Sequence, residues 1–296
     1  MTRMLIALAA AAAASTPTVG AKIRTGFQPC GVAAYGSYLY VTNYGSGNLT
    51  RIDPRTNKVV RTVKVGHGPC GVVAGGGFLW VENFNSDTIS RINPRTLRGT
   101  RQIRVGHKPW DVDYAFGSAW ATNQLDGTVS RIDAKTLKVT TTIKTGGNPT
   151  CVRSGAGSIW IGSQGTNDVY RIDPATNAVT AIDVGKGGEL CVDAHSDGVW
   201  VSNDVDGSVS RIDPATNAVV ATTKVGTAPS DGVRGPDGLE WIPNRGDGTI
   251  SRIDPATNAV VDTFSVTGTP FVVRSAFGDI WVDDFKGNQE WRVHVH

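Results

Sequence analysis

The sequence SRIDPATNAVV spans Ser210–Val220 and recurs unchanged at Ser251–Val261, and a near copy, YRIDPATNAVT, begins at Tyr170. Its Arg-Ile-Asp or Arg-Ile-Asn element recurs at intervals of 40 or 41 residues, beginning at Arg51, Arg91, Arg131, Arg171, Arg211 and Arg252. Self-similarity at about 40 residues is typical of β-propellers and solenoids. The chain is therefore built from copies of one structural unit.

Each unit also carries a large aromatic residue eleven positions before its arginine, at Tyr40, Trp80, Trp120, Trp160, Trp200 and Trp241. A seventh pair is Trp281 and Arg292, although the sequence RVHVH that follows lacks the rest of the motif. In order, a unit contains an apolar run after a proline, a Gly-rich turn, the aromatic run (LWVEN), a polar turn, the VSRID run, the DPATN hairpin and a Val- and Thr-rich run. These alternating runs and turns predict four strands per unit.

The sequence predicts an all-β fold, a seven-bladed β-propeller with four-stranded antiparallel blades. Radial stacking buries both faces of such sheets, with the aromatic residue as a wedge between blades. A solenoid would need polar caps at both ends, and none is visible. Only six units have their own fourth strand, but Val19–Gly26 aligns with Val59–Gly66. We expect Val19–Gly26 to complete the last blade and close the ring, which makes residues 16–296 a single domain.

The N-terminal residues 1–15 are predicted to be a signal peptide. Arg3 precedes an apolar run from Met4 to Ala14, which is too short to span a bilayer of about 30 Å. We expect cleavage near residues 14–16 and a soluble, monomeric protein that is secreted, periplasmic or at the cell surface, with no membrane partner. The net charge of +3, with 19% charged residues, gives no basic footprint for nucleic acid.

The four cysteines occur as two pairs with equal phase. Cys30 and Cys70 occupy the same position of units 1 and 2, and Cys151 and Cys191 share a position in units 4 and 5. Because equivalent innermost strands of neighbouring blades approach closely, we predict disulfides Cys30–Cys70 and Cys151–Cys191. The alternative is that all four thiols line the channel and bind a soft metal such as Cu(I) or Zn.

The repeated strand motifs carry a family resemblance. Tyr40-Val41-Thr42-Asn43 spells YVTN, and other copies read WVEN, WATN and WVSN. The chain resembles the YVTN-repeat β-propeller family, exported or surface proteins of prokaryotes, over essentially its whole mature length. It is more distantly similar to the virginiamycin B (streptogramin) lyases, seven-bladed, magnesium-dependent enzymes that open a cyclic lactone antibiotic. The resemblance implies the fold, but a fold does not determine an activity.

Ligands of such a ring usually bind at one mouth of the central channel, where the loops after each second and fourth strand converge. Both sets of loops follow the repeat, so the positions where a residue departs from the repeat are the informative ones for a binding site. We expect the residues at these positions to form an acidic, partly aromatic mouth that binds a small ligand or a metal. The alternative is that they form a solvated loop face without a ligand. The candidates are His67, Glu82, His107, Trp110, Asp111, Glu189, Asp204, Asp231, Arg245, Asp283 and Asp284.

Three functional hypotheses follow. The first is a module that binds a small molecule or a protein at the mouth. The second is a metal-assisted lyase, for which the resemblance implies a divalent metal such as Mg²⁺ and a histidine base. It requires one histidine and two carboxylates to converge within about 5 Å at one mouth of the channel, and the sequence does not say which mouth. No catalytic residue can be transferred from those lyases, in which the residue after the blade proline is often His. Here that residue is Cys30, Cys70, Trp110, Thr150, Ser230 or Phe271, and we expect His195 on the opposite face. The third is single-stranded nucleic-acid binding through a basic, aromatic rim around Trp110 and Phe271.

Overall fold

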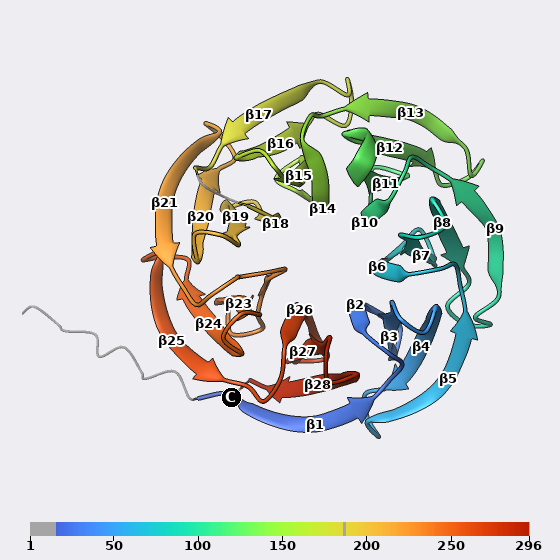
Figure 1. Ribbon diagram of the computed structural model, residues 1–296, viewed down its shortest axis with the longest axis horizontal. Coiled ribbons are helices and arrows are strands. Elements are labelled where there is room, and N and C mark those ends of the chain that lie inside the picture. Colours follow the sequence, from blue (N-terminus) through green and yellow to red (C-terminus); the bar gives the residue numbers. More distant parts are fainter. Residues whose placement is uncertain (1–15, 186–187, 296) are drawn as a thin grey trace, which may run out of the picture.

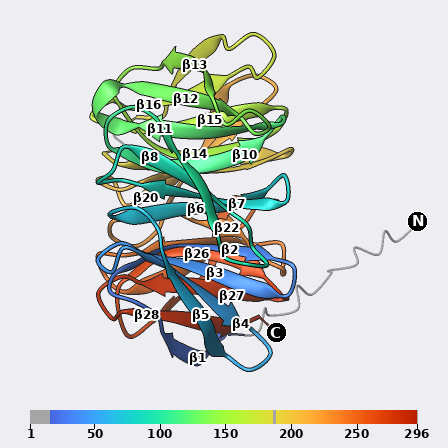
Figure 2. The ribbon, with the colours of Figure 1, turned by 90° about the vertical axis from the view of Figure 1, so that its right-hand side faces the viewer.

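The structure, a computed structural model, describes residues 16–185 and 188–295. Figure 1 shows their sheets arranged as seven blades around a central axis, and Figure 2 shows the same ring from the side. The expected signal peptide, residues 1–15, lies outside the described residues. Within them the only helix is a 3-10 turn, η1 (Gln124–Asp126), so no described helix is of a kind that could cross a membrane.

Each blade is an antiparallel four-stranded sheet, and in blades 1 to 6 the strands run in chain order from the axis outward. The first three blades are β2 (Pro29–Tyr35) to β5 (Lys58–Lys64) through β3 (Tyr38–Asn43) and β4 (Asn48–Asp53); β6 (Pro69–Gly75), β7 (Phe78–Asn83), β8 (Thr88–Ile92) and β9 (Gly99–Arg104); and β10 (Pro109–Ala115), β11 (Ser118–Asn123), β12 (Thr128–Asp133) and β13 (Val139–Lys144). The next three are β14 (Asn148–Gly155), β15 (Ser158–Gln164), β16 (Asp168–Ile172) and β17 (Val179–Asp183); β18 (Leu190–His195), β19 (Gly198–Asn203), β20 (Ser208–Asp213) and β21 (Ala218–Lys224); and β22 (Val233–Arg234), β23 (Glu240–Asn244), β24 (Thr249–Asp254) and β25 (Ala259–Ser265).

Blade 7 joins the two ends of the described chain. It consists of β26 (Pro270–Ala276), β27 (Asp279–Asp284), β28 (Gln289–His294) and, outermost, β1 (Thr18–Arg24). β1 pairs antiparallel with β28, with Thr18 opposite His294 and Ile23 opposite Glu290. This confirms the predicted closure, and with it the seven-bladed ring. Closure pairs the edge of β28, which would otherwise be open for association with other chains.

The core lies between the blades. The repeated aromatic residues are fully buried, and each apolar cluster combines neighbouring blades; one contains Tyr40 and Leu49 of blade 1 with Leu79 and Val81 of blade 2. Four of the indoles, Trp80, Trp120, Trp160 and Trp281, donate their N–H to a backbone carbonyl five residues earlier, at 3.0–3.1 Å. In these four blades the aromatic wedge therefore fills the space between sheets with its polar atom paired, whereas the buried Nε1 of Trp200 has no partner among the described residues.

The verbatim repeat is explained by contacts between successive blades. The Arg211 guanidinium lies 5.2 Å from the Trp200 ring of its own blade and donates to Pro255 O and Asn258 Oδ1 in the next DPATN hairpin, at 2.6 and 2.9 Å. Each such asparagine has a left-handed backbone (φ 59° at Asn258), a conformation that Asn tolerates well. The same arginine-to-hairpin contact is made by Arg131, Arg171 and Arg292, the last of which reaches Pro54 and Asn57 of blade 1.

Arg252 of blade 6 departs from this pattern for a topological reason. In blade 7 the two outer strands, β28 and β1, are not consecutive in the chain, so no DPATN hairpin joins them. Arg252 instead pairs with Asp237 at 3.1 Å and, through Nε at 2.8 Å, with Asp262. The corresponding residue of β21 is Ala221, so the acidic residue in β25 compensates for the missing hairpin.

We expect Arg211→Ala to lower the free energy of unfolding by about 2 kcal/mol, because it removes two charge-assisted hydrogen bonds to the next blade and a cation–π contact within its own blade. Urea denaturation followed by tryptophan fluorescence measures this. Arg61→Ala, at an exposed position of β5, should change the value by less than about 0.5 kcal/mol. Equal effects of the two substitutions would contradict the role given to the repeated arginine.

Both predicted disulfides are present. Cys30–Cys70 joins blades 1 and 2 and Cys151–Cys191 joins blades 4 and 5, with Cα–Cα distances of 4.7 and 5.0 Å. The alternative of four thiols that bind a soft metal is wrong, because none of the cysteines is free. Disulfides are typical of proteins in an oxidising compartment.

Blade 6 has an incomplete inner strand where the sequence predicts a full one after Pro229. β22 spans only two residues, and Asp231 instead forms a parallel bridge with Val272 of blade 7. The neighbouring strand β23 carries Pro243, whose carbonyl accepts from Ser230 but whose nitrogen has no hydrogen to donate. The inner strand of blade 6 consequently pairs with its neighbour β23 at only two positions, Val233 with Trp241 and Arg234 with Glu240.

Candidate functional site

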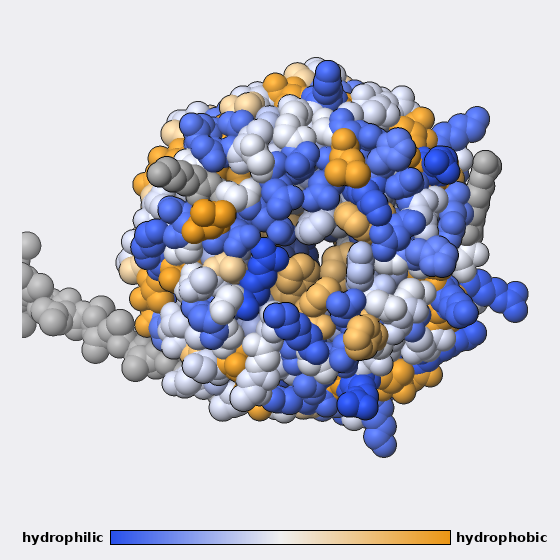
Figure 3. All heavy atoms as spheres, viewed as in Figure 1, coloured by the Kyte–Doolittle hydropathy of each residue, from blue (hydrophilic) through white to orange (hydrophobic). Residues whose placement is uncertain are grey.

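One mouth of the channel contains an apolar cavity, which we call the aromatic cup. Its volume is about 240 Å³ and it is lined by Cys30, Tyr44, Cys70, Phe84, Trp110, Phe271 and Phe285. Figure 3 shows a hollow at the centre of the ring, with hydrophobic residues on its lower and right side, where β2, β6 and β26 lie in Figure 1, and hydrophilic residues opposite. The mouth is thus divided into an apolar and a polar half.

The repeat explains how these rings come together. Tyr44, Phe84 and Phe285 each directly follow the second strand of a blade, whereas Trp110 and Phe271 follow the proline that begins a first strand. Ring centroids lie 6.2 Å apart for Tyr44–Phe84, 5.6 Å for Phe84–Trp110 and 5.2 Å for Phe271–Phe285. With the Cys30–Cys70 bridge beside them, the rings support one another and the cup is preformed.

The polar half is formed by three side chains, which we call the polar arc: Glu189, Asp204 and Arg245. Arg245 Nη2 lies 2.7 Å from Asp204 Oδ2 and 3.2 Å from Glu189 Oε2, and its guanidinium is 5.7 Å from the Phe271 ring. Burial raises the pKa of Glu189 in spite of the nearby guanidinium. Two carboxylates against one guanidinium leave the arc with an excess negative charge next to the cup.

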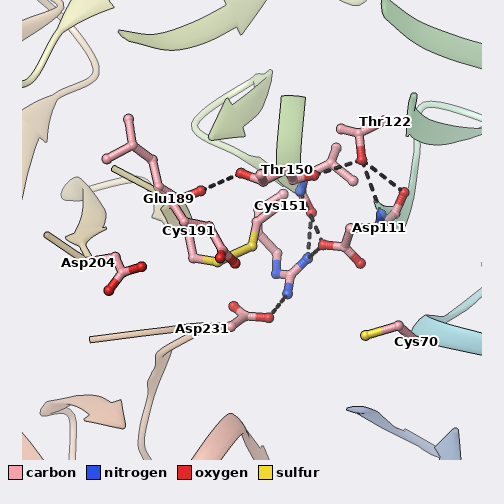
Figure 4. The surroundings of a disulfide bond; sticks show 12 residues. Cys70, Asp111, Thr122, Thr150, Cys151, Glu189, Cys191, Asp204 and Asp231 are labelled. Carbon is pink, nitrogen blue, oxygen red and sulfur yellow. Dashed lines mark hydrogen bonds and ion pairs between the residues drawn. A yellow bond between two sulfur atoms is a disulfide. The ribbon is translucent and has the colours of Figure 1, made fainter. Parts of the chain in front are cut away.

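Beneath the cup, an ion-pair network crosses the channel. Arg153 bridges Asp111 Oδ2 and Asp231 Oδ2 at 2.5 Å each, and Arg274 Nη2 lies 2.6 Å from Asp231 Oδ2. Figure 4 shows Asp111 and Asp231 next to the Cys151–Cys191 bridge, and the Arg153 guanidinium is the group that contacts both carboxylates. Burial raises the pKa of Asp231 to about 7, against the effect of Arg153. Because Arg153 and Arg274 also line a second cavity of about 180 Å³ toward the opposite face, the network separates the cup from that face.

The structure brings six of the predicted site residues to this mouth. Trp110 belongs to the cup, Asp111 and Asp231 to the network, and Glu189, Asp204 and Arg245 to the polar arc. The two predicted histidines lie outside the cavity. His67 is exposed on its loop, and His107 is exposed and pairs with Asp126 at 2.8 Å, a contact that raises the pKa of His107.

The other three predicted residues lie buried in or beside strands. Glu82 Oε2 accepts the N–H groups of Cys70 and Gly71 at 3.1 and 2.9 Å, and burial raises its pKa well above the usual range. Asp284 Oδ1 accepts the N–H groups of Thr269 and Gly287 at 3.0 Å. Asp283 faces Glu290 across the β27–β28 ladder. None of the three lines the cup.

Asp283 and Glu290 form a carboxyl pair in the core of blade 7. Both are fully buried, and the position of Glu290 holds an aliphatic residue in each other blade: Leu49, Ile89, Val129, Val169, Val209 and Ile250. Burial raises the pKa of Asp283 to about 7 and that of Glu290 well above its usual range. The pair therefore retains at least one proton at neutral pH.

Because the folded-state pKa values are raised, the wild type should lose stability as pH rises from about 4 through about 7. Asp283→Thr with Glu290→Leu, the residues of blade 1, should raise stability at pH 8 by about 1–4 kcal/mol and change it much less at pH 4. Urea denaturation at both values measures the difference. The exposed Asp206→Asn is the control. A double variant with the same free energy of unfolding as the wild type at pH 8 would contradict the view that the buried carboxyl pair is destabilising there.

Among the described residues, the arrangement that the lyase hypothesis requires, one histidine and two carboxylates, is found at the opposite face and not at the mouth of the cup. Within residues 16–185 and 188–295, one group of three His, Asp or Glu side chains has ligand atoms within 4.8 Å of one another. That group, Asp193, His195 and Glu240, lies at the turn between the first and second strands, on the opposite face. The mouth offers an apolar cup and a charged arc, which suit binding rather than proton abstraction.

Sequence reasoning finds Trp110, Phe271 and the two cysteines of the cup but not Tyr44, Phe84 and Phe285. A comparison of the positions after each second strand finds these three rings, because the other blades have Gln124, Gln164, Asp204 and Arg245 there. Sequence reasoning also missed Arg153 and Arg274, which share one position of the first strand with Ala33, Val73, Asp113, Asp193 and Val233. The available signal is that four of the seven blades have a charged residue at a position that is aliphatic in the other three.

Comparisons with known proteins agree on the architecture. A family model described as YNCE-like beta-propeller matches residues 73–239, in keeping with the resemblance to YVTN-repeat propellers. Among solved structures, a streptogramin B lyase aligns with a TM-score of 0.84 at 13% identity (97% of this chain, 100% of that one), and a hydrazine synthase of Kuenenia stuttgartiensis with 0.81 at 17% (94% and 98%). A catalytically inactive virginiamycin B lyase from Staphylococcus aureus with quinupristin aligns with 0.81 at 14% (95% and 100%). No curated protein matches the sequence. At these identities the similarity shows the fold alone.

Proposed function

The chain belongs to the YNCE-like β-propeller family, and from that premise we propose that it is an exported, monomeric binding protein whose aromatic cup takes an apolar ring or side chain of a small molecule or peptide. The observation that carries this proposal is the preformed cavity of about 240 Å³ at the mouth. A cavity of about 150 Å³ holds benzene, so the cup has room for a group of one or two rings.

The charges around the cup favour a neutral or cationic ligand. The polar arc has an excess negative charge, and five aromatic rings beside it attract cations through their faces. The loops nearest the cup have more acidic residues (Asp87, Asp126, Glu189, Asp204, Asp206 and Asp247) than basic ones (Lys108, Arg245 and Lys286), whereas the exposed Arg24, Lys64, Arg104, Lys144 and Lys224 end the fourth strands at the outer rim. The nucleic-acid hypothesis would require a basic surface at the mouth itself, and the polar arc there is acidic.

We expect 1-naphthylmethylammonium, a two-ring cation, to bind with one-to-one stoichiometry in isothermal titration calorimetry, and naphthalene-1-sulfonate to bind more weakly. Trp110→Ala and Phe271→Ala should each weaken binding of the cation at least about tenfold, because each removes a wall of the cup. Phe116→Ala is the matched control: this ring is 51% exposed at a turn of the opposite face. Binding that is unchanged in the cup variants, or no saturable binding, would contradict the proposal.

The lyase remains the alternative because solved streptogramin and virginiamycin B lyases share the fold. Incubation with quinupristin and Mg²⁺, followed by chromatography, distinguishes the two. We expect the compound to remain intact, since the one group of a histidine and two carboxylates among the described residues, Asp193, His195 and Glu240, lies at the face opposite the cup. Ring opening that a chelator abolishes would establish the enzyme instead.

A further inference from the structure

Three side chains of metal-ligand type converge at the face opposite the cup. Asp193 and His195 stand two residues apart on β18 and so project from the same side of that strand. Glu240 begins β23 in the neighbouring blade. His195 Nε2 lies 2.8 Å from Asp193 Oδ2 and 3.7 Å from Glu240 Oε1. One nitrogen and two carboxylates thus meet across the blade 5–blade 6 boundary.

Glu240 is the residue that most needs an explanation. Its position, directly before the repeated aromatic residue, is aliphatic in every other blade: Leu39, Leu79, Ala119, Ile159, Val199 and Ile280. The Glu240 side chain is fully buried, and its Oε2 has no hydrogen-bond partner among the described residues. A buried carboxylate oxygen without a donor is destabilising unless a cation or proton satisfies it.

Arg234 satisfies only part of this demand. Its Nε lies 2.5 Å from Glu240 Oε1, its backbone N–H donates to Asp193 Oδ2 at 2.9 Å, and its terminal nitrogens contact the half-exposed Asp197. It therefore holds both carboxylates in place while leaving Glu240 Oε2 unpartnered, as an outer partner of a metal ligand does. Three carboxylates (Asp193, Asp197 and Glu240) against one guanidinium leave a deficit that a divalent cation would offset.

We propose that Asp193, His195 and Glu240 bind a structural divalent transition metal of the Zn²⁺ type, which joins blade 5 to blade 6. A ligand set with an imidazole nitrogen favours Zn²⁺ over Mg²⁺ and Ca²⁺, which prefer oxygen alone. Three protein ligands leave a fourth position for water, and Asp193 also lines the channel cavity of about 180 Å³.

The location gives the metal a structural purpose. The two disulfides join blades 1 to 2 and 4 to 5, whereas the blade 5–blade 6 boundary has neither bridge. It is also where β22 shortens to two residues. A metal held by β18 and β23 would replace contacts that the short inner strand does not make. The site is independent of the cup, which lies at the other mouth.

The test uses the untagged mature protein, stripped with EDTA and dialysed, in calorimetry and thermal denaturation with ZnCl₂. We expect one equivalent of Zn²⁺ to bind and, at a hundredfold excess over its Kd, to raise the unfolding temperature by about 5 °C or more. MgCl₂ should have little effect. His195→Gln should abolish both responses. Glu240→Val should also abolish them while remaining folded, because it restores the aliphatic residue of blade 5.

The matched control is His294→Ala. His294 lies 3.1 Å from a single carboxylate, Asp279, and its loss should leave the Zn²⁺ equivalent intact. A Zn²⁺ equivalent that persists in His195→Gln and Glu240→Val, or that disappears in His294→Ala, would overturn the assignment, as would the absence of any saturable binding. Should a variant fail to fold, anomalous diffraction at the zinc edge from wild-type crystals decides the matter by showing density, or none, between the three side chains.

Discussion

A chain that begins at Thr25, and therefore lacks β1, should lose at least about 5 kcal/mol of folding free energy relative to one that begins at Thr16, a large share of the stability of an ordinary domain. β1 supplies the fourth strand of blade 7, and its Ile23 is buried in one cluster with Val32 and Trp281. Its removal also uncovers β28, including Trp291, which Lys22 now approaches at 5.3 Å. Urea denaturation of the two chains measures the loss.

The matched experiment is complementation. A synthetic peptide of residues 16–25 should restore the stability of the shortened chain, because the open edge of β28 offers the same backbone partners to a separate strand. A peptide with Ile23→Asp should not restore it. If the shortened chain were as stable as the longer one, the ring would not depend on β1.

Loss of either disulfide should have the second largest effect. Each bridge closes a loop with a sequence separation of 40 residues, for which the chain-entropy model gives about 4 kcal/mol. We therefore expect Cys151→Ala with Cys191→Ala, and likewise Cys30→Ala with Cys70→Ala, to lower the free energy of unfolding by about 2–4 kcal/mol in urea denaturation.

The two pairs differ in what else they should change. Cys30 and Cys70 line the aromatic cup, whereas Cys151 and Cys191 do not. Naphthylmethylammonium binding should therefore weaken in the first double variant and persist in the second at temperatures where both are folded. Equal affinity of the two variants for naphthylmethylammonium would contradict a role of the Cys30–Cys70 bridge in the cup. An unchanged free energy of unfolding in both variants would contradict the stabilising role of the bridges between blades.

The fold could be predicted almost completely because each copy of the repeat forms one blade, so the number and order of the copies give the topology. The spacing of the arginines gave the blade count, the alignment of Val19–Gly26 gave the closure, and the equal phase of the cysteines gave the two pairings. What the repeat could not show is the short inner strand of blade 6, which follows from the single proline Pro243.

The site could be predicted only in part, because periodicity assigns a residue to a strand but not to the mouth or the core. Glu82 and Asp283 stand one residue before the end of a strand, and both face inward. The ion pair between Arg153 and Asp231 joins blades 4 and 6, which are not consecutive in the chain. No local sequence pattern predicts such a pair. The residues that depart from the repeat nevertheless include Trp110 and all three side chains of the polar arc.

A crystal structure of the protein with 1-naphthylmethylammonium tests most directly whether the aromatic cup is the binding site. We predict density for the two rings against Phe84, Trp110 and Phe271, above the Cys30–Cys70 bridge, with the ammonium directed toward Glu189 and Asp204. Density at the opposite mouth or on the outer strands, with an empty cup, would contradict it.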